Sequence, residues 1–172
     1  MKKYNHSFMI ARFQPFHNGH KSIIDKMLKD SKNITIILGS SQEHGTAKNP
    51  LDVSQREQLI INIYGKKDNI KILSLDDIDC DSDYWYNHVI EFLKKEVPQF
   101  GFPDAYYCGD MENGHYYDKG YFKIEIVNRE NQVGFKKISA SEIRKMIVEH
   151  DDNWKNFIPD ENIELIENFL YN

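Results

Sequence analysis

The segment "SFMIARFQPFHNGHKSIIDKML", residues 7–28, joins a short apolar run to a helical pattern through a loop of aromatic and basic residues. Its first part, "SFMIA", has the length and composition of a β-strand. Ile23, Ile24, Met27 and Leu28 then recur at the spacing of one helix face. A strand followed directly by a helix is the first half of a βαβ unit, so this segment predicts an α/β fold.

The rest of the chain continues the alternation of strands and helices. Further strands are predicted at 33–39, 70–75, 104–109 and 122–127, and further helices at 55–64, 83–96, 139–149 and 161–170. This order predicts a single Rossmann-like, doubly wound parallel sheet with helices on both faces, in one domain that spans residues 1–172. The segment 111–120, rich in Gly, Tyr and His, is expected to be a loop.

Three helix starts carry recognisable signals. Ser54 with Glu57, and Ser139 with Glu142, have the spacing of a capping box, in which the two side chains satisfy each other's free backbone N–H groups. Asp160 is expected to begin the last helix. These positions predict where the helices start.

Charge and hydropathy limit the classes of function. The 172 residues carry a net charge of −5 and a pI of about 5.8, which argues against a nucleic-acid partner. The mean hydropathy is −0.64, and the chain has no apolar stretch near the roughly 20 residues that cross a bilayer, so no membrane partner is expected. Cys80 and Cys108 are too few for a disulfide framework, and the N-terminus lacks a signal-peptide core. We therefore expect reduced thiols and a cytoplasmic location.

The polar part of the opening segment lies beyond the carboxyl end of the first predicted strand, where open α/β sheets bind ligands. His17 is expected near the N-cap of the helix that follows, and His20 lies one turn further on the same face. The helix start offers free N–H groups, and Arg12 adds a two-pronged donor. Together these groups predict an anion site suited to phosphate.

Taken alone, these residues also have explanations other than a catalytic or ligand-binding role. A His-x-x-His pair by itself is more often incidental than catalytic, and packing explains Phe13 and Phe16 better than stacking on a ligand. A zinc site is disfavoured, because HExxH is absent and neither cysteine belongs to a CxxC pair.

Four blocks together carry a resemblance to one family. They are "RFQPFHNGH" (12–20), "GSSQEHGTAKNP" (39–50), "DDIDCDSDYW" (76–85) and "ISASEIRKMI" (138–147). In this order they resemble the His-Xaa-Gly-His nucleotidyltransferases, and specifically the archaeal-type nicotinamide mononucleotide (NMN) adenylyltransferases. Ala11 stands where that family usually has glycine, and Ala140-Ser141 replaces Gly-Thr. The spacing of "DSDYW" is closer to the variant that is fused to a Nudix hydrolase domain.

The resemblance implies transfer of AMP from ATP to the 5′-phosphate of NMN, giving NAD and pyrophosphate. It implies catalytic roles for Arg12, His17, His20 and Arg144. It implies that ATP contacts these histidines, Arg144, Phe13, Gln14, Gly109, Ser139 and Ser141. It implies that NMN contacts Ser40, Asp77, Asp79 and Trp85. Mg²⁺ is expected to arrive with ATP, with no dedicated protein metal site. Archaeal relatives form higher oligomers, so a homo-oligomer stays open.

Two other functions stay open at this level. Another adenylyl- or cytidylyltransferase of the same superfamily would act on phosphopantetheine or on a CTP-linked alcohol phosphate, which Trp85 and the GSSQ-type loop disfavour. A non-catalytic nucleotide-sensing module would bind ATP or NAD without turnover. The intact His17, His20 and Arg144 disfavour that alternative.

Overall fold

The computed structural model describes residues 1–110, 114, 117–127 and 139–171. In this part of the chain, five parallel strands form one sheet: β1 (Tyr4–Ala11), β2 (Ser31–Leu38), β3 (Ile70–Ser74), β4 (Ala105–Cys108) and β5 (Lys123–Ile126). The helices are α1 (Asn18–Asp30), α2 (Val53–Tyr64), α3 (Ser82–Glu96), α5 (Ala140–Val148) and α6 (Ile163–Tyr171), with 3₁₀ turns at Pro98–Phe100, Asp152–Phe157 and Asp160–Asn162. Within the described residues, no helix has the length and apolar character that crossing a bilayer requires.

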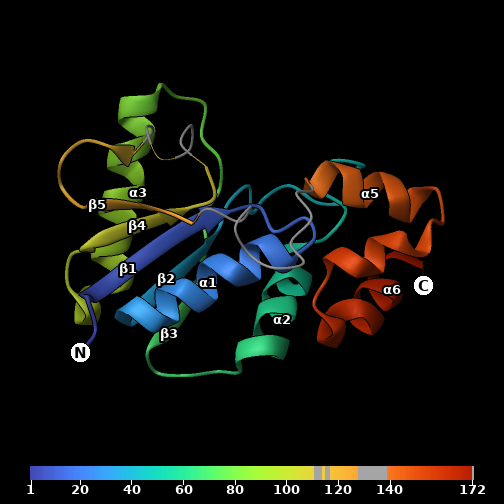
Figure 1. Cartoon of the computed structure of the whole chain (residues 1–172). Coiled ribbons are helices and arrows are strands. Elements are labelled where there is room, and N and C mark those ends of the chain that lie inside the picture. The colour runs from blue at the N-terminus through green and yellow to red at the C-terminus, as the bar shows by residue number, and fades with distance from the viewer. Residues whose placement is uncertain (111–113, 115–116, 128–138, 172) are drawn as a thin grey trace.

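Helices cover both faces of the sheet, as predicted. Successive residues of β1 show why, because alternate side chains of a strand point to opposite faces. Met9 packs with Ile24 of α1, whereas Phe8 packs with Val89 of α3. Figure 1 shows α3 on one side of the sheet and α1 and α2 on the other, with α5 and α6 beside α2. Apolar residues occupy both the odd and the even positions of the strands, so both faces of the sheet are apolar. Helices therefore cover both faces, which is the doubly wound arrangement.

The strand order is β3-β2-β1-β4-β5, so the chain moves outward from β1 in both directions. The connection after β1 leads to β2 on one side, and the later connection returns to β4 on the other. Between the carboxyl ends of β1 and β4 the loops diverge and leave a crevice, which is where open α/β sheets bind ligands. The middle of the segment 7–28, from Met9 to His20, contributes lining residues to this crevice.

The start of α2 differs from the predicted one. The capping box of α2 is Asp52 with Gln55, two residues before the predicted Ser54 and Glu57. Asp52 Oδ1 accepts from the Gln55 N–H at 2.8 Å, and the Gln55 side chain accepts from the Asp52 N–H at 2.9 Å. The prediction was wrong because two overlapping cap patterns occur in this stretch, and the earlier one directly follows Leu51, which the core holds in place.

The predicted starts of the last two helices and the predicted loop 111–120 can also be compared with the structure. The Ser139–Glu142 capping box is confirmed at the start of α5. Asp160 begins a 3₁₀ turn, and α6 itself starts at Ile163. In the predicted loop 111–120, Gly114 and Tyr117 are helical, so the loop prediction is wrong at those two positions, while 111–113 and 115–116 lie outside the described residues. Ile138, the first residue of "ISASEIRKMI", also lies outside them.

A buried histidine, His6, is expected to link the stability of the fold to pH. His6 is fully buried, with its Nδ1 2.9 Å from the Gly101 carbonyl and its Nε2 2.9 Å from Thr35 Oγ1. Burial lowers the pKa of His6 below its ordinary value of 6.5, and the hydrogen bond to the Gly101 carbonyl and the charge of Asp104 offset this only in part. The unfolded chain therefore binds a proton more readily than the native protein does as the pH falls below about 6.5.

We expect the free energy of unfolding to decrease between pH 7 and pH 5, with His6 contributing no more than about 2 kcal/mol of that loss. The His6→Gln variant, whose amide does not titrate, should show a smaller decrease over the same range. Urea unfolding of both proteins at the two pH values measures the difference. Parallel losses in the two proteins would assign the pH dependence to other groups.

Candidate active site

The loop after β1 leads into α1 through the two histidines. His17 is the N-cap residue, and its Nδ1 accepts a hydrogen bond from the Gly19 N–H at 3.1 Å. His20 Nδ1 accepts from the His17 N–H at 3.3 Å, which completes a capping box made of two imidazoles. The rings stack with their centroids 3.8 Å apart. Because both Nδ1 atoms act as acceptors, the proton of each neutral ring lies on Nε2, and the Nε2–H groups are donors.

Both imidazoles line a cavity of about 340 Å³ at the crevice. The loop after β4 supplies Gly109 and Asp110 to its wall, and the loop after β1 supplies Arg12. This cavity therefore combines two imidazole donors, a guanidinium and the start of α1. Such a set of donors suits the oxygens of a phosphate chain.

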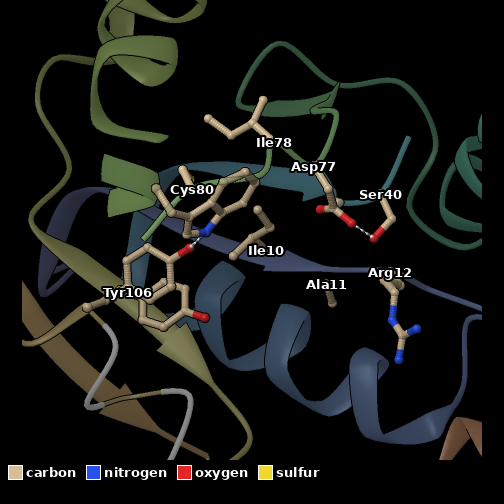
Figure 2. A pocket seen from close by; sticks show the side chains of 11 residues that line it. Ile10, Ala11, Arg12, Ser40, Asp77, Ile78, Cys80 and Tyr106 are labelled. Atoms are coloured by element: carbon tan, nitrogen blue, oxygen red, sulfur yellow. Dashed lines mark hydrogen bonds between the residues drawn. The ribbon is translucent and has the colours of Figure 1, made fainter. Parts of the chain in front are cut away.

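A second cavity of about 340 Å³ lies on the other side of β1. Figure 2 shows Ser40 and Asp77 at one end of it, and Cys80 and Tyr106 at the other. Ser40 Oγ donates to Asp77 Oδ2 at 2.6 Å. Trp85 also lines this cavity, and its indole N–H donates to the Tyr117 hydroxyl at 3.1 Å. An aromatic wall facing a carboxylate suits a flat, cationic ring.

The two cavities meet at the end of β1. Ile10, Ala11, Arg12 and Tyr106 line both of them. Ala11, at the position where the family named in the sequence analysis usually has glycine, is thus part of the wall that the two cavities share. Molecules bound in the two cavities would therefore lie beside the same four residues, and such proximity is what a transfer reaction requires.

Arg144 comes from α5, far along the chain, and it contacts the loop after β1 without being among the described residues that line either cavity. Its guanidinium donates to the Gln14 carbonyl at 2.8 Å, to the Ala47 carbonyl at 3.1 Å and to Ser141 Oγ at 3.0 Å. Burial lowers the pKa of Arg144, and the positive charge of Arg12 lowers it further. Two guanidinium cations that repel each other favour an anion between them.

The structure brings together only part of the predicted site. His17, His20, Arg12 and Gly109 line the first cavity, and Ser40, Asp77 and Trp85 line the second. Asp79 is exposed and is not among the described residues that line either cavity. Among the described residues of the stretch 76–85, Asp77 is the one whose carboxylate lines the second cavity.

Four predicted ATP contacts have side chains that serve other partners. Gln14 donates to and accepts from the Leu51 backbone at 2.7 and 3.0 Å, and Phe13 packs against Phe16 and His20. Ser139 is bound to Glu142 through its hydroxyl and its N–H, and Ser141 Oγ accepts from Arg144. The geometry therefore supports a structural role for these side chains.

The sequence analysis assigned Trp85 to NMN but left the tyrosines of the second cavity without a role. Tyr106 and Tyr117 both line it, and their ring centroids lie 4.3 Å apart. The position of Tyr106 near the end of β4 was an available signal, because the carboxyl ends of β1 and β4 flank the crevice. No local pattern marks Tyr117.

Residues 8–146 match the model of the cytidylyltransferase-like family, which is most of the chain. The chain belongs to this family. Two similar proteins are nicotinamide-nucleotide adenylyltransferases of Methanococcus vannielii and Methanococcus aeolicus. The first is 30% identical over 164 residues, covering 93% of this chain and 87% of the relative. The second is 31% identical over 166 residues, covering 94% and 87%. These relatives confirm the resemblance found in the sequence.

A solved structure gives the same result for the fold. The bifunctional NMN adenylyltransferase/ADP ribose pyrophosphatase of Francisella tularensis, complexed with AMP and a manganese ion, superimposes with a TM-score of 0.74 at 25% identity. The match covers 90% of this chain and 44% of that one, so this chain spans less than half of the bifunctional protein. The nucleotidyltransferase fold is thereby confirmed.

Proposed function

We propose that residues 1–172 form a single nucleotidyltransferase domain that acts as an NMN adenylyltransferase. It transfers AMP from ATP to the 5′-phosphate of NMN and releases pyrophosphate. The observation that carries the proposal is the meeting of two cavities at the end of β1, one lined by His17, His20 and Arg12 and the other by Trp85 and Asp77. The names of the similar archaeal proteins support it.

In the proposed reaction, an oxygen of the NMN phosphate forms a bond to the α-phosphorus of ATP. The bond from that phosphorus to the oxygen bridging to the β-phosphorus breaks, and pyrophosphate leaves. The attacking phosphate is already ionised near neutral pH, so the reaction needs no general base. The site has to hold two anions in line and to stabilise the charge that develops between them.

Three donors of the first cavity, together with Arg144 from outside its lining, are assigned to that task. The Nε2–H groups of His17 and His20 donate to the triphosphate, with His20 nearest the α-phosphate. Arg12 and Arg144 hold the β- and γ-phosphates and the leaving pyrophosphate. Their mutual repulsion, which contributes to the lowered pKa of Arg144, is relieved when the phosphates lie between them.

The second cavity is assigned to the acceptor. Trp85 stacks on the cationic nicotinamide ring, and its hydrogen bond to Tyr117 holds the indole in place. Asp77 faces the ring's amide, while Ser40 fixes the carboxylate through the 2.6 Å hydrogen bond. The shared wall at Ala11 then brings the acceptor's phosphate toward ATP.

A divalent metal enters this proposal as part of the ATP complex. Among the described residues, no group of three or more His, Cys, Asp or Glu side chains is arranged to hold a metal ion. Asp110 is the carboxylate on the wall of the first cavity. We therefore propose that Mg²⁺ is held mainly by phosphate oxygens and water, and that it supplies charge neutralisation there.

Incubation with ATP, Mg²⁺ and a panel of phosphorylated acceptors tests the function, with pyrophosphate and the adenylylated product as readouts. The panel contains NMN, nicotinate mononucleotide, phosphopantetheine and, with CTP in place of ATP, an alcohol phosphate. NAD formation from NMN is the expected result. Turnover with another acceptor alone would favour a different transferase, and ATP binding without any pyrophosphate would favour a nucleotide sensor.

The acceptor cavity should prefer NMN over its deamidated analogue. The analogue carries a carboxylate where NMN carries a neutral amide, and Asp77 would place a like charge against it. Such contacts cost several kcal/mol when they are partly desolvated, so kcat/KM should favour NMN by at least about tenfold. In Asp77→Asn the preference should shrink by about fivefold or more.

Asp83→Asn is the matched control for this experiment, because Asp83 belongs to the same acidic stretch but pairs with Lys119 at the surface. Its preference should equal that of the wild type. Equal kcat/KM for both acceptors in the wild-type protein would refute the charge filter. A preference that persists in Asp77→Asn would assign it to other groups.

A further inference from the structure

Arg56 of α2 is a fully buried cation that neither substrate role uses. Its guanidinium has five N–H donors, and the structure pairs all of them with main-chain carbonyls. Nε donates to the Asp52 carbonyl at 3.3 Å. Nη1 donates to the carbonyls of Arg12 at 3.0 Å and Gly39 at 2.8 Å. Nη2 donates to the carbonyls of Ser40 at 3.3 Å and Ser41 at 3.4 Å. These carbonyls belong to the loops after β1 and β2 and to the start of α2.

The two loops held in this way contain strained backbone. Phe13, in the loop after β1, has φ of 54°, and Ser40, in the loop after β2, has φ of 49°. Residues other than glycine rarely adopt this left-handed region, and they stay there only where the surroundings hold them. Arg56 binds the peptide group that precedes Phe13 and the peptide groups on both sides of Ser40.

The same loops carry the groups that face the two substrates. The loop after β1 presents Arg12 to both cavities and leads to His17, and the loop after β2 presents Ser40, which orients Asp77. Arg56 itself is not among the described residues that line either cavity. The hydrogen bonds of Arg56 therefore act on the reaction through the backbone of these loops, beside a longer-range charge interaction with Asp77.

We propose that Arg56 is a positioning residue: its guanidinium fixes the two substrate loops relative to each other, so that the phosphates of the two substrates meet in line. The proposal rests on the proposed function. A planar fork is required, because a lysine has three donors on one nitrogen and cannot reach carbonyls on opposite sides. Misplacement of a reacting group by about 1 Å can cost about 10²-fold in rate.

Two variants test this role in complementary ways. Arg56→Lys keeps the charge with fewer donors, and Arg56→Met keeps much of the volume with no donor and no buried charge, so it gives a second chance of a folded protein. Asn162→Ala is the matched control. Asn162 is also fully buried and donates to a carbonyl of α2, that of Leu59 at 2.9 Å, but it lies away from both cavities.

Amide hydrogen exchange is the first readout, because it does not depend on activity. Peptides covering 12–16 and 39–43 should both exchange at least about tenfold faster in the Arg56 variants, while peptides of α3 stay unchanged. Asn162→Ala should leave 12–16 and 39–43 at the wild-type rate. Unchanged exchange of these two segments in the Arg56 variants overturns the proposal whatever the activity.

Steady-state kinetics are the second readout, normalised to the folded fraction. In both Arg56 variants kcat should fall at least about tenfold, with each KM changed by less than about threefold, whereas Asn162→Ala keeps the wild-type kcat. Faster exchange with an unchanged kcat overturns the positioning role. A wild-type protein that makes no NAD overturns the proposed function instead, and the exchange data then still decide whether Arg56 holds the loops together.

Discussion

Replacing His20 with alanine should lower kcat by about 10²-fold or more, the scale for the loss of one preorganised donor to a developing negative charge. The KM values should change little, because Arg12, His17 and Arg144 remain to hold the ground-state phosphates. Within the first cavity, the hydrogen bond from the His17 N–H to His20 Nδ1 leaves Nε2–H as the donor. Steady-state kinetics with ATP and NMN measure the effect.

The His20→Ala change also removes half of a helix cap, which by itself costs about 1 kcal/mol of stability. His20→Gln separates the two effects, since glutamine at this position of a capping box still accepts from the N-cap N–H. We expect Gln to restore most of the thermal stability and little of the kcat. A kcat near the wild-type value in the alanine variant would make His20 a structural residue.

Replacing Arg144 with alanine should raise the KM for ATP and lower kcat, each by about tenfold or more. The charge on pyrophosphate grows as the bond breaks, so the guanidinium binds the transition state more strongly than the ground state. Hydrogen bonds to charged groups contribute about 1.5–3 kcal/mol each, which supports a combined loss of about 10²-fold in kcat/KM. The same change frees the Gln14 and Ala47 carbonyls that Arg144 now binds.

Arg144→Lys should recover only part of the activity, because a point charge cannot reproduce the planar fork. Lys145→Ala is the control for charge removal, since Lys145 is an exposed neighbour on the same helix whose nearest ion pair, to Glu149, spans 3.8 Å. It should behave as the wild type. Full activity of the lysine variant would mean that Arg144 supplies a general positive field.

Much of the local structure could be predicted from the sequence because its causes are local. The alternation of apolar runs and helical spacing predicted the layered fold, and the structure confirms helices on both faces of the parallel sheet. His17 and His20 lie within one helix turn, so their joint placement at the start of α1 follows from short-range geometry. The capping error at α2 shows the limit, since two cap patterns two residues apart compete locally and a contact with the core selects one.

Local sequence patterns could not predict which residues line each cavity. Ser139, Ser141, Phe13 and Gln14 stand beside the motifs in sequence, yet the fold supplies nearby partners that occupy their side chains. Tyr117 joins the second cavity from a segment without a recognisable signal. A side chain's partner depends on which other segments fold against it, and one sequence does not list those segments.

By itself the sequence determined which side chains are candidates for binding phosphate, and it predicted His17 and His20 at a helix start beyond the first strand. The tertiary structure decided how the groups combine. It brought Arg144 within 2.8 Å of the Gln14 carbonyl, 130 positions away in the chain, and it joined the loops after β1 and β2 through Arg56. The physical reason is that a phosphate site needs donors converging from several directions, and only packing of distant segments around a common core creates that convergence.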